Sequence, residues 1–253
     1  MRFASLGSGS RGNATLIEAG QTRLLLDNGF AAREAELRLA ALEVDPGSIN
    51  AILVTHEHQD HIRGVGAFAR RYRLPVYMTH GTFRQNRCGE LAECHFISGH
   101  QPTFSIGDIA VQPFTVPHDA SEPVQYRFSH GDGALGILTD TGMATPHIME
   151  ILAGCDALIL ETNHDVTMLA SGPYPPSLQR RVGGGHGHLN NHQAAAILKG
   201  LDYQRLQHVV AAHLSEKNNS AERVEQTLLE VAPEIEDRLA FTHQDRTSDW
   251  FEF

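Results

Sequence analysis

Short apolar runs separated by turn residues dominate the first two thirds of the chain. Two of them, Ala14–Ala19 and Arg23–Asp27, flank a turn at Gly20, a pattern typical of a β-hairpin. The same pattern predicts further strands at Ala51–Thr55, Pro75–Met78, Phe104–Ile106, Ile109–Val116, Val124–Phe128, Ala134–Thr139, Ala157–Leu160 and His208–Ala212. These runs predict a protein built largely on β-sheets.

Helical spacing alternates with these strands. It predicts helices at Ala31–Leu42, Ile62–Tyr72 and Asn190–Leu201, and a further helix that ends at Val231 and opens with an Asn219-x-x-Glu222 capping box. The Pro- and Gly-rich stretch Ser171–Gly187 is predicted to be a loop. The whole pattern predicts a layered α/β protein with helices packed on two sheets, and the length suits one large domain or two small ones.

Composition adds limits. The 253 residues are 41% hydrophobic and 20% charged, which is ordinary for a globular protein. No apolar run approaches the length of a membrane helix and the N-terminus has no signal-peptide pattern, so we expect a cytoplasmic protein without membrane contact. The net charge of −10 disfavours nucleic-acid binding by the whole surface, but not by a local basic strip. Cys88, Cys94 and His95 are weighed as an alternative, structural zinc site.

The clearest chemical signal is the segment Thr55-His56-Glu57-His58-Gln59-Asp60-His61, directly after an apolar strand. Alternation places His56 and His58 on the same side of an extended segment, so one metal ion can take both. Asp60 and His61 follow where a helix is expected to begin, and from there they can face a second metal ion a few ångströms away. Four metal-ligand residue types within six positions predict a metal site.

Other predicted strands also end in acidic or imidazole side chains. They deliver Asp27, His118 with Asp119, Asp140, the segment Glu161 to Asp165, and His213. Several strands that bring such groups to their carboxyl ends are what a shared crevice needs. The sequence therefore predicts that these residues meet the histidine-rich segment.

At this point the chain resembles the metallo-β-lactamase superfamily. The motif T-H-E-H-Q-D-H is similar to its H-x-H-x-D-H signature, and the order of the later acidic and imidazole residues is similar to its motif series. The resemblance spans essentially the whole chain and implies a single domain over residues 1–253. It implies a four-layer αβ/βα sandwich of two mixed sheets and outer helices, with a two-metal site at one sheet edge. It implies one metal on His56, His58 and His118, a second on Asp60, His61 and His213, a bridging Asp140, and Asp27 as a hydrogen-bonding support for the ligands. Donors without thiolate favour Zn²⁺, with Mn²⁺ or Fe²⁺ as alternatives.

The resemblance also indicates a general acid. In the nuclease branches a histidine near the position of His188 protonates the leaving oxygen, so His188 is expected to take this role, with His186 and His192 as rivals. Glu161 or Asp165 is expected to orient that histidine, and His164 is a further candidate for the site. Asp60 is also counted among the catalytic residues. Arg180, Arg181 and Asn13 are candidate substrate contacts, the arginines because guanidinium groups suit phosphate.

In finer detail the chain looks like the YycJ/WalJ-like branch of this superfamily. The pieces that carry this likeness are Ser5-Leu6-Gly7-Ser8-Gly9-Ser10, Leu160-Glu161-Thr162-Asn163-His164-Asp165, Tyr174-Pro175-Pro176-Ser177-Leu178, Gly187-His188-Leu189 and Ala212-His213-Leu214-Ser215. One departure is Asn190, where the branch usually shows Ser. The spacing between His118 and Asp140, and between Asp140 and His188, leaves no room for the substrate-holding modules of ribonuclease Z or ribonuclease J.

A two-metal site makes hydroxide available near neutral pH, so the expected reaction is hydrolysis. The expected function is a dinuclear phosphodiesterase or nuclease, with exonuclease activity implied by the branch, acting on nucleic acid or a small phosphodiester. A thioester or lactone hydrolase, and a non-catalytic metal-bearing regulatory module, are the alternatives. The sequence does not define the oligomeric state, and a homodimer is one option.

Overall fold

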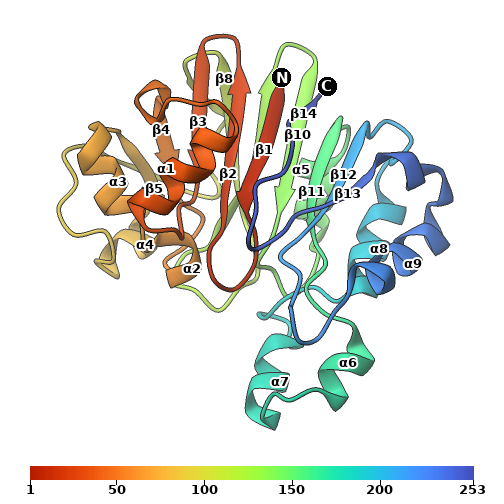
Figure 1. Ribbon diagram of the computed structural model, residues 1–253. Helices are drawn as coiled ribbons and strands as arrows, with labels where there is room; N and C mark the ends of the chain where they lie inside the picture. The colour runs from red at the N-terminus through yellow and green to blue at the C-terminus, as the bar shows by residue number, and fades with distance from the viewer. The chain divides into compact units, whose positions relative to one another are not determined.

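Two mixed seven-stranded β-sheets carry the chain, and the computed structural model describes all residues 1–253 (Figure 1). The first sheet has, in spatial order, β14 (Phe251–Glu252), β1 (Arg2–Gly7), β2 (Ala14–Ala19), β3 (Thr22–Leu26), β4 (Ala51–Leu53), β5 (Val76–Thr79) and β6 (Cys94–Ile97). The second has β13 (Leu239–Phe241), β12 (His208–Ala212), β11 (Ala157–Glu161), β10 (Gly133–Leu138), β9 (Val124–His130), β8 (Ile109–Thr115) and β7 (Phe104–Ile106). The two predicted mixed sheets are confirmed.

Nine α-helices connect or flank the strands. They are α1 (Ala32–Ala41), α2 (Gln59–Ile62), α3 (Val65–Tyr72), α4 (His80–Arg84), α5 (Pro146–Leu152), α6 (Val166–Ser171), α7 (Pro176–Val182), α8 (Asn191–Gly200) and α9 (Ala221–Val231), with short 3₁₀ turns at Pro46–Ser48 and Pro233–Arg238. None of these helices is both long and apolar enough to pass through a lipid bilayer.

The chain forms two compact units. Unit 1 comprises residues 1–115, 120–133 and 243–253, and unit 2 comprises residues 116–119 and 134–242. In unit 1, β3 to β6 are parallel. In unit 2, β10 to β13 are parallel as well. Because parallel strands end at the same edge, each unit gathers its strand-end residues at one place.

A hydrophobic core holds α1 and α3 against the first sheet in unit 1. Leu39 of α1 and Phe68 of α3 are fully buried in one cluster with Leu25, Ile52 and Val76 from three adjacent strands. On the other side of this sheet, the hydroxyl of the buried Tyr126 in β9 donates to the Val54 carbonyl at 2.8 Å. The end of β4, where the histidine-rich segment begins, is therefore fixed from both faces.

The predicted helix Ile62–Tyr72 is two helices, because the chain bends at Gly64. The Gly64 amide donates to the Asn28 carbonyl at 2.8 Å, and a Cβ built on Gly64 would lie 1.8 Å from the Phe30 carbonyl oxygen. Gly29 is equally close, since its Cβ would lie 1.9 Å from the Asp60 carbonyl oxygen. Only glycine permits these approaches. The loop after β3 therefore packs closely against α2, the helix that contains Asp60.

The prediction of a loop at Ser171–Gly187 is wrong. Ser171 ends α6, and Pro176–Val182 forms α7, with Pro175 at the N-cap and Pro176 in the first turn. Proline suits this position, because its fixed φ matches the helix and its missing amide is not needed there. The three prolines thus mark a helix start as well as a loop.

The predicted capping box at Asn219-x-x-Glu222 is also wrong. Ser220 is the N-cap of α9, and its hydroxyl accepts from the Arg223 amide. The buried Asn219 side chain is engaged instead with Asn191 and with the Thr162 carbonyl. The Asn190 start of α8 does form a capping box, with Gln193 as its second member.

We predict that Gly64→Ala destabilises the protein by about 1–3 kcal/mol, the usual cost of forcing an atom into a packed region. The added Cβ meets backbone, which cannot rotate away. Urea unfolding, followed by far-UV circular dichroism, measures the loss. Gly47→Ala is the matched control, since its Cβ would have its nearest neighbour at an ordinary 3.4 Å. Equal midpoints for the two variants would contradict the prediction.

Candidate metal centre

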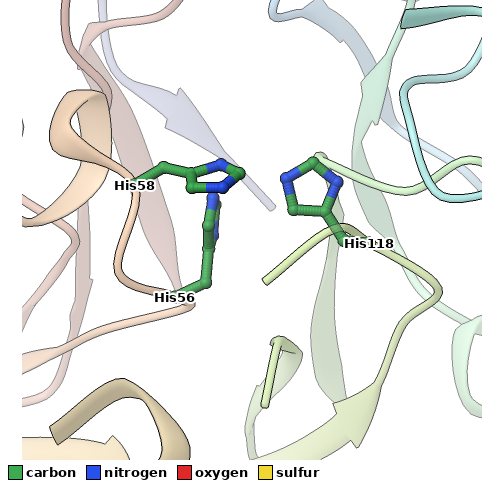
Figure 2. Close-up of side chains that lie close together, drawn as sticks. All are labelled: His56, His58 and His118. Carbon is green, nitrogen blue, oxygen red and sulfur yellow. The ribbon is translucent and has the colours of Figure 1, made fainter. Parts of the chain in front are cut away.

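Unit 1 presents four potential metal ligands at the carboxyl end of β4. His56 and His58 lie on the extended loop after the strand, with ring centroids 4.6 Å apart in an edge-on arrangement. Figure 2 shows these two rings side by side, and it also draws His118, which comes from the loop after β8 and is described below with unit 2. Asp60 and His61 follow in the single turn of α2. The four side chains of this segment thus lie on one short stretch of chain after β4, and their role as metal ligands stays a prediction.

The Asp27 carboxylate organises this segment from the end of β3. One oxygen accepts the Thr55 amide at 2.8 Å, and the other accepts the Thr55 hydroxyl and His61 Nδ1, each at 2.8 Å. The Thr55 hydroxyl also meets His56 Nδ1 at 2.9 Å. All four residues are buried. Asp27 is therefore hydrogen-bonded to His61 directly and linked to His56 through Thr55.

These contacts fix the tautomers of two histidines. A carboxylate only accepts, so His61 Nδ1 carries its proton. The Thr55 hydroxyl gives its single proton to Asp27, so it accepts from His56 Nδ1, which is protonated too. In both rings the lone pair is then on Nε2, the form in which imidazole binds a metal.

Three site residues have left-handed backbone conformations. Asp27, Asp140 and His213 have φ values of 58°, 53° and 56°, and each directly follows a strand or lies within two residues of one. This region is unfavourable for residues other than glycine and is often found at functional sites.

Asn13 holds together the turn between β1 and β2. Its side-chain Oδ1 accepts the Gly9 amide at 2.8 Å, and its side-chain Nδ2 contacts the Gly9 carbonyl, the Asp60 carboxylate and His61 Nε2 at 3.0–3.2 Å. Its role as a substrate contact stays a prediction. The structure adds that Asn13 holds Asp60 and His61 in place.

Unit 2 has its own cluster at the ends of β10, β11 and β12. Asp140, Glu161, His188 and His213 each offer a donor atom, and these atoms all lie within 4.8 Å of one another. His213 Nδ1 lies 3.1 Å from Asp140 Oδ2. Burial lowers the pKa of His213, but the Asp140 carboxylate more than offsets this, so the pKa is raised above its usual value.

Glu161 is the orienting carboxylate for His188. It is fully buried, and its Oε1 accepts His188 Nδ1 at 2.7 Å. Its Oε2 accepts the backbone amides of Thr141 and Leu189, at 3.2 and 3.1 Å. Asp165, the other expected partner, instead caps α6 and pairs with Arg223. His186 and His192 are exposed.

His118 belongs to unit 2 through a four-residue loop. Its Nδ1 faces the Gly187 carbonyl at 3.1 Å, which again leaves the lone pair on Nε2, and Nε2 lies 4.0 Å from Asp140 Oδ1. The next residue, Asp119, accepts Arg181 Nε at 2.5 Å. Arg180 is exposed on the same helix. Sequence reasoning missed the orienting roles of Thr55 and Asp119, although each stands next to a predicted ligand.

The donor sets in both units fit divalent cations. They consist of imidazole nitrogens with fixed tautomers and carboxylates, which suit zinc, manganese or iron. No cysteine takes part in any such cluster, and burial raises the pKa of the Cys88 thiol to about 11. Each unit thus carries imidazole and carboxylate groups of the kind that bind divalent cations.

The fold and these residues define a metal-binding protein of the class with two mixed sheets and helices on their outer faces. A family model described as "Beta-lactamase superfamily domain" matches residues 22–213. The chain belongs to this family.

Relatives match over nearly the full length. Exodeoxyribonuclease YycJ of Bacillus anthracis is 35% identical over 237 residues, covering 92% of this chain and 90% of the relative. Exodeoxyribonuclease WalJ of Streptococcus pneumoniae strain D39 is 35% identical over 235 residues, covering 90% and 87%. The crystal structure of the metallo-β-lactamase fold protein YhfI from Bacillus subtilis aligns over 98% of both chains, with a TM-score of 0.76 and 16% identity. The predicted superfamily, branch and fold are confirmed.

We predict that Asp27→Asn weakens metal binding about 10- to 100-fold, the usual effect of removing a hydrogen-bond partner of a metal-binding histidine. The amide no longer accepts from both Thr55 and His61 Nδ1. Competition with a chromophoric chelator measures the affinity. Asp45→Asn, an exposed helix cap in the same unit, is the control and should bind like the unchanged protein.

We also predict that His164 makes the protein less stable in mild acid. Its ring is buried, Nδ1 has no hydrogen-bond partner, and burial lowers its pKa from 6.5 to about 4. Below pH 6.5 the unfolded chain takes up a proton that the folded one refuses, so stability falls as pH drops from 6.5 toward 4. At pH 5 this costs about 2 kcal/mol.

The measurement is the free energy of unfolding at pH 7 and pH 5. His164→Gln should remove this part of the acid loss, whereas His130→Gln, at an exposed histidine, should leave it unchanged. Equal acid losses in all three proteins would contradict the assignment.

Proposed function

We propose that the two donor sets form one dinuclear metal centre, and that the protein is a metal-dependent phosphodiesterase acting on nucleic acid from a strand end. The observation that carries this proposal is the Asp27-ordered histidine segment in a chain that matches exodeoxyribonucleases over nine tenths of its length. Neither donor set by itself provides the full number of ligands for two cations.

Chain connectivity supports joining the two sets. The Ser121 amide donates to the Glu57 carboxylate at 2.8 Å, and the Val124 amide donates to the Thr55 carbonyl at 3.1 Å. His118 is only three residues before Ser121, so its Cα lies within about 11 Å of that residue. Because Ser121 is hydrogen-bonded to Glu57, the short chain from His118 to Ser121 supports the proposal that His118 joins the ligands of the His56–His58 segment.

The loop of His118 is also hydrogen-bonded to segments of unit 2 that lie next to Asp140 and His188. The Gly142 amide donates to the Pro117 carbonyl at 2.9 Å, and the Asp119 amide donates to the His186 carbonyl at 3.0 Å. We assign His56, His58 and His118 to one cation and Asp60, His61 and His213 to the other, with Asp140 shared. Zinc is the proposed metal, and manganese or iron is the alternative.

Divalent cations in this centre would supply Lewis acidity, which makes water a nucleophile near neutral pH and polarises a phosphoryl oxygen. The chain's own contribution to bond cleavage is a proton. His188 Nδ1 is held by Glu161, so in the imidazolium form Nε2 carries the transferable proton. We propose that His188 donates this proton to the leaving oxygen of the nucleotide.

Arg181 is proposed to help place the substrate. The ion pair with Asp119 holds its guanidinium beside the loop of His118, and the side chain remains largely exposed. A guanidinium fixed in this way can contact a phosphate with its remaining N–H groups. Arg180, on the same helix, can add positive charge.

We predict that His188→Ala keeps its metal but slows phosphodiester cleavage about 10²–10⁴-fold, the usual contribution of a general acid. His58→Ala, in contrast, should lose both metal and activity. End-labelled single- and double-stranded DNA and RNA, with zinc- or manganese-loaded protein, measure turnover and polarity, and elemental analysis measures the metal content.

A substrate whose leaving group needs no proton, such as bis-p-nitrophenyl phosphate, should be cleaved by His188→Ala with a much smaller loss. Full activity of His188→Ala on DNA would overturn the assignment of the acid. Good thioester turnover without any phosphodiester cleavage by the unchanged protein would overturn the proposed function.

A further inference from the structure

A group of stacked, exposed aromatic rings lies at the edge of the first sheet. Phe83 and Phe96 are 42% and 44% exposed, and their ring centroids are 5.0 Å apart in an edge-on arrangement. The Phe96 ring is stacked on His80, with centroids 3.9 Å apart and an interplanar angle of 15°. We call His80, Phe83 and Phe96 the aromatic platform.

Phe96 is exposed because no further strand pairs with the outer side of β6. Phe96 is in the edge strand β6, opposite Met78 of β5, which is buried in the core. His80 and Phe83 are in α4, the short helix that directly follows β5. The other large exposed apolar residues, Leu37, Met143 and Val166, are on separate segments. The platform is the one place where two such side chains meet, and a grouped exposed apolar surface usually marks a binding site.

The platform is linked to the metal-binding segment through contacts within unit 1. Gln85, just after α4, donates to the Ser121 hydroxyl at 2.6 Å, and the Ser121 amide donates to the Glu57 carboxylate. The Gly81 amide of α4 donates to the Glu122 carboxylate at 2.7 Å. Figure 1 shows α4 and α2 near the same end of the first sheet. A strand that reaches the metal ligands of α2 would thus pass within a few nucleotides of the platform.

Charge around the platform suits a polyanion. Arg84 ends α4, Arg87 follows three residues later, and both are exposed without an acidic partner. The carboxylates of Glu57 and Glu122 are hydrogen-bonded to the Ser121 and Gly81 amides rather than to these arginines. Arg84 and Arg87 therefore offer two guanidinium groups beside the rings, in a chain whose net charge is −10. Positive groups beside exposed rings are the combination that binds single-stranded nucleic acid.

We propose that the aromatic platform stacks a base of the single-stranded substrate while Arg84 and Arg87 contact its phosphates. The ring faces provide stacking that does not depend on base identity, as every base has a π-face. This assignment rests on the proposed function, because it gives the scissile strand a second point of attachment away from the metals. It makes affinity for the strand depend on bases that are not themselves cleaved.

The test separates strand binding from chemistry. Binding of a fluorescein-labelled phosphorothioate oligonucleotide, which resists cleavage, is measured by anisotropy on metal-loaded protein, with DNA and RNA versions in separate arms. The double variant Phe83→Leu/Phe96→Leu keeps apolar volume but removes the flat rings. It should bind at least about tenfold more weakly, since one stacked base is worth 1–3 kcal/mol.

Three comparisons make the result specific. Phe96→Trp keeps a ring and should bind as tightly as the unchanged protein or more tightly, and Leu37→Ala, at an exposed residue of α1, should bind normally. An oligonucleotide with abasic sites should bind weakly to the unchanged protein and no more weakly to the double leucine variant. Hydrolysis of bis-p-nitrophenyl phosphate should be equal in all of these proteins, which shows that the metal centre is intact.

The two levels of inference fail differently. If the unchanged protein cleaves oligonucleotides and the double leucine variant matches it in both Kd and KM, the platform assignment is overturned and the proposed function stands. If the unchanged protein cleaves no phosphodiester, the proposed function is overturned, and the platform falls with it as a substrate site.

Discussion

The buried Asp27 carboxylate is the contact on which the metal-binding segment depends. It accepts three hydrogen bonds, from the amide and hydroxyl of Thr55 and from His61 Nδ1. Burial raises the pKa of its carboxyl, whereas the bonds from His61 and Thr55 act to lower it. The buried charge of Asp27 is tolerated because both carboxylate oxygens accept hydrogen bonds. The same bonds determine which nitrogen of His56 and of His61 carries the proton.

In unit 2, histidine Nδ1 atoms are also held by hydrogen-bond acceptors. Glu161 has two backbone amides on one oxygen and His188 on the other, and the Gly187 carbonyl holds His118. In both units a carboxylate or carbonyl oxygen accepts the Nδ1–H of the ring. Nε2 is then left to bind a metal ion or to donate a proton. A ring that faces a cation becomes a ligand, whereas a ring beside the cations can keep a proton to donate. The hydrogen-bond acceptor at Nδ1 of each histidine therefore determines which nitrogen is left for metal binding or proton transfer.

Periodicity and motif spacing predicted much of this in advance. Most strands are predicted correctly, and Asp27, Asp140 and His213 do lie at or near strand ends, because buried strands leave local patterns in the sequence. Their roles as metal ligands or supports stay predictions. The break at Gly64, the start of α7 at Pro176 and the cap at Ser220 were missed. Gly64 is needed because the Phe30 carbonyl approaches it from a distant loop, and Asn219 loses the cap to buried partners 28 and 57 residues away. Such constraints come from tertiary packing, and no window of sequence contains them.

The charge balance in unit 2 favours a functional explanation over a structural one. Asp140 and Glu161 are both buried, and their donor atoms lie within 4.8 Å of each other and of two imidazoles. Buried charges cost stability unless they are paired, and apolar residues of similar size would usually be the more stable choice. Left-handed backbone at Asp140 and His213 adds strain to the same place. A cluster that combines desolvated carboxylates with strained backbone is hard to explain by folding alone. A cation held by Asp140 and a proton on His188 beside Glu161 would offset the negative charge, so the same groups that the proposed hydrolysis requires would also stabilise this cluster.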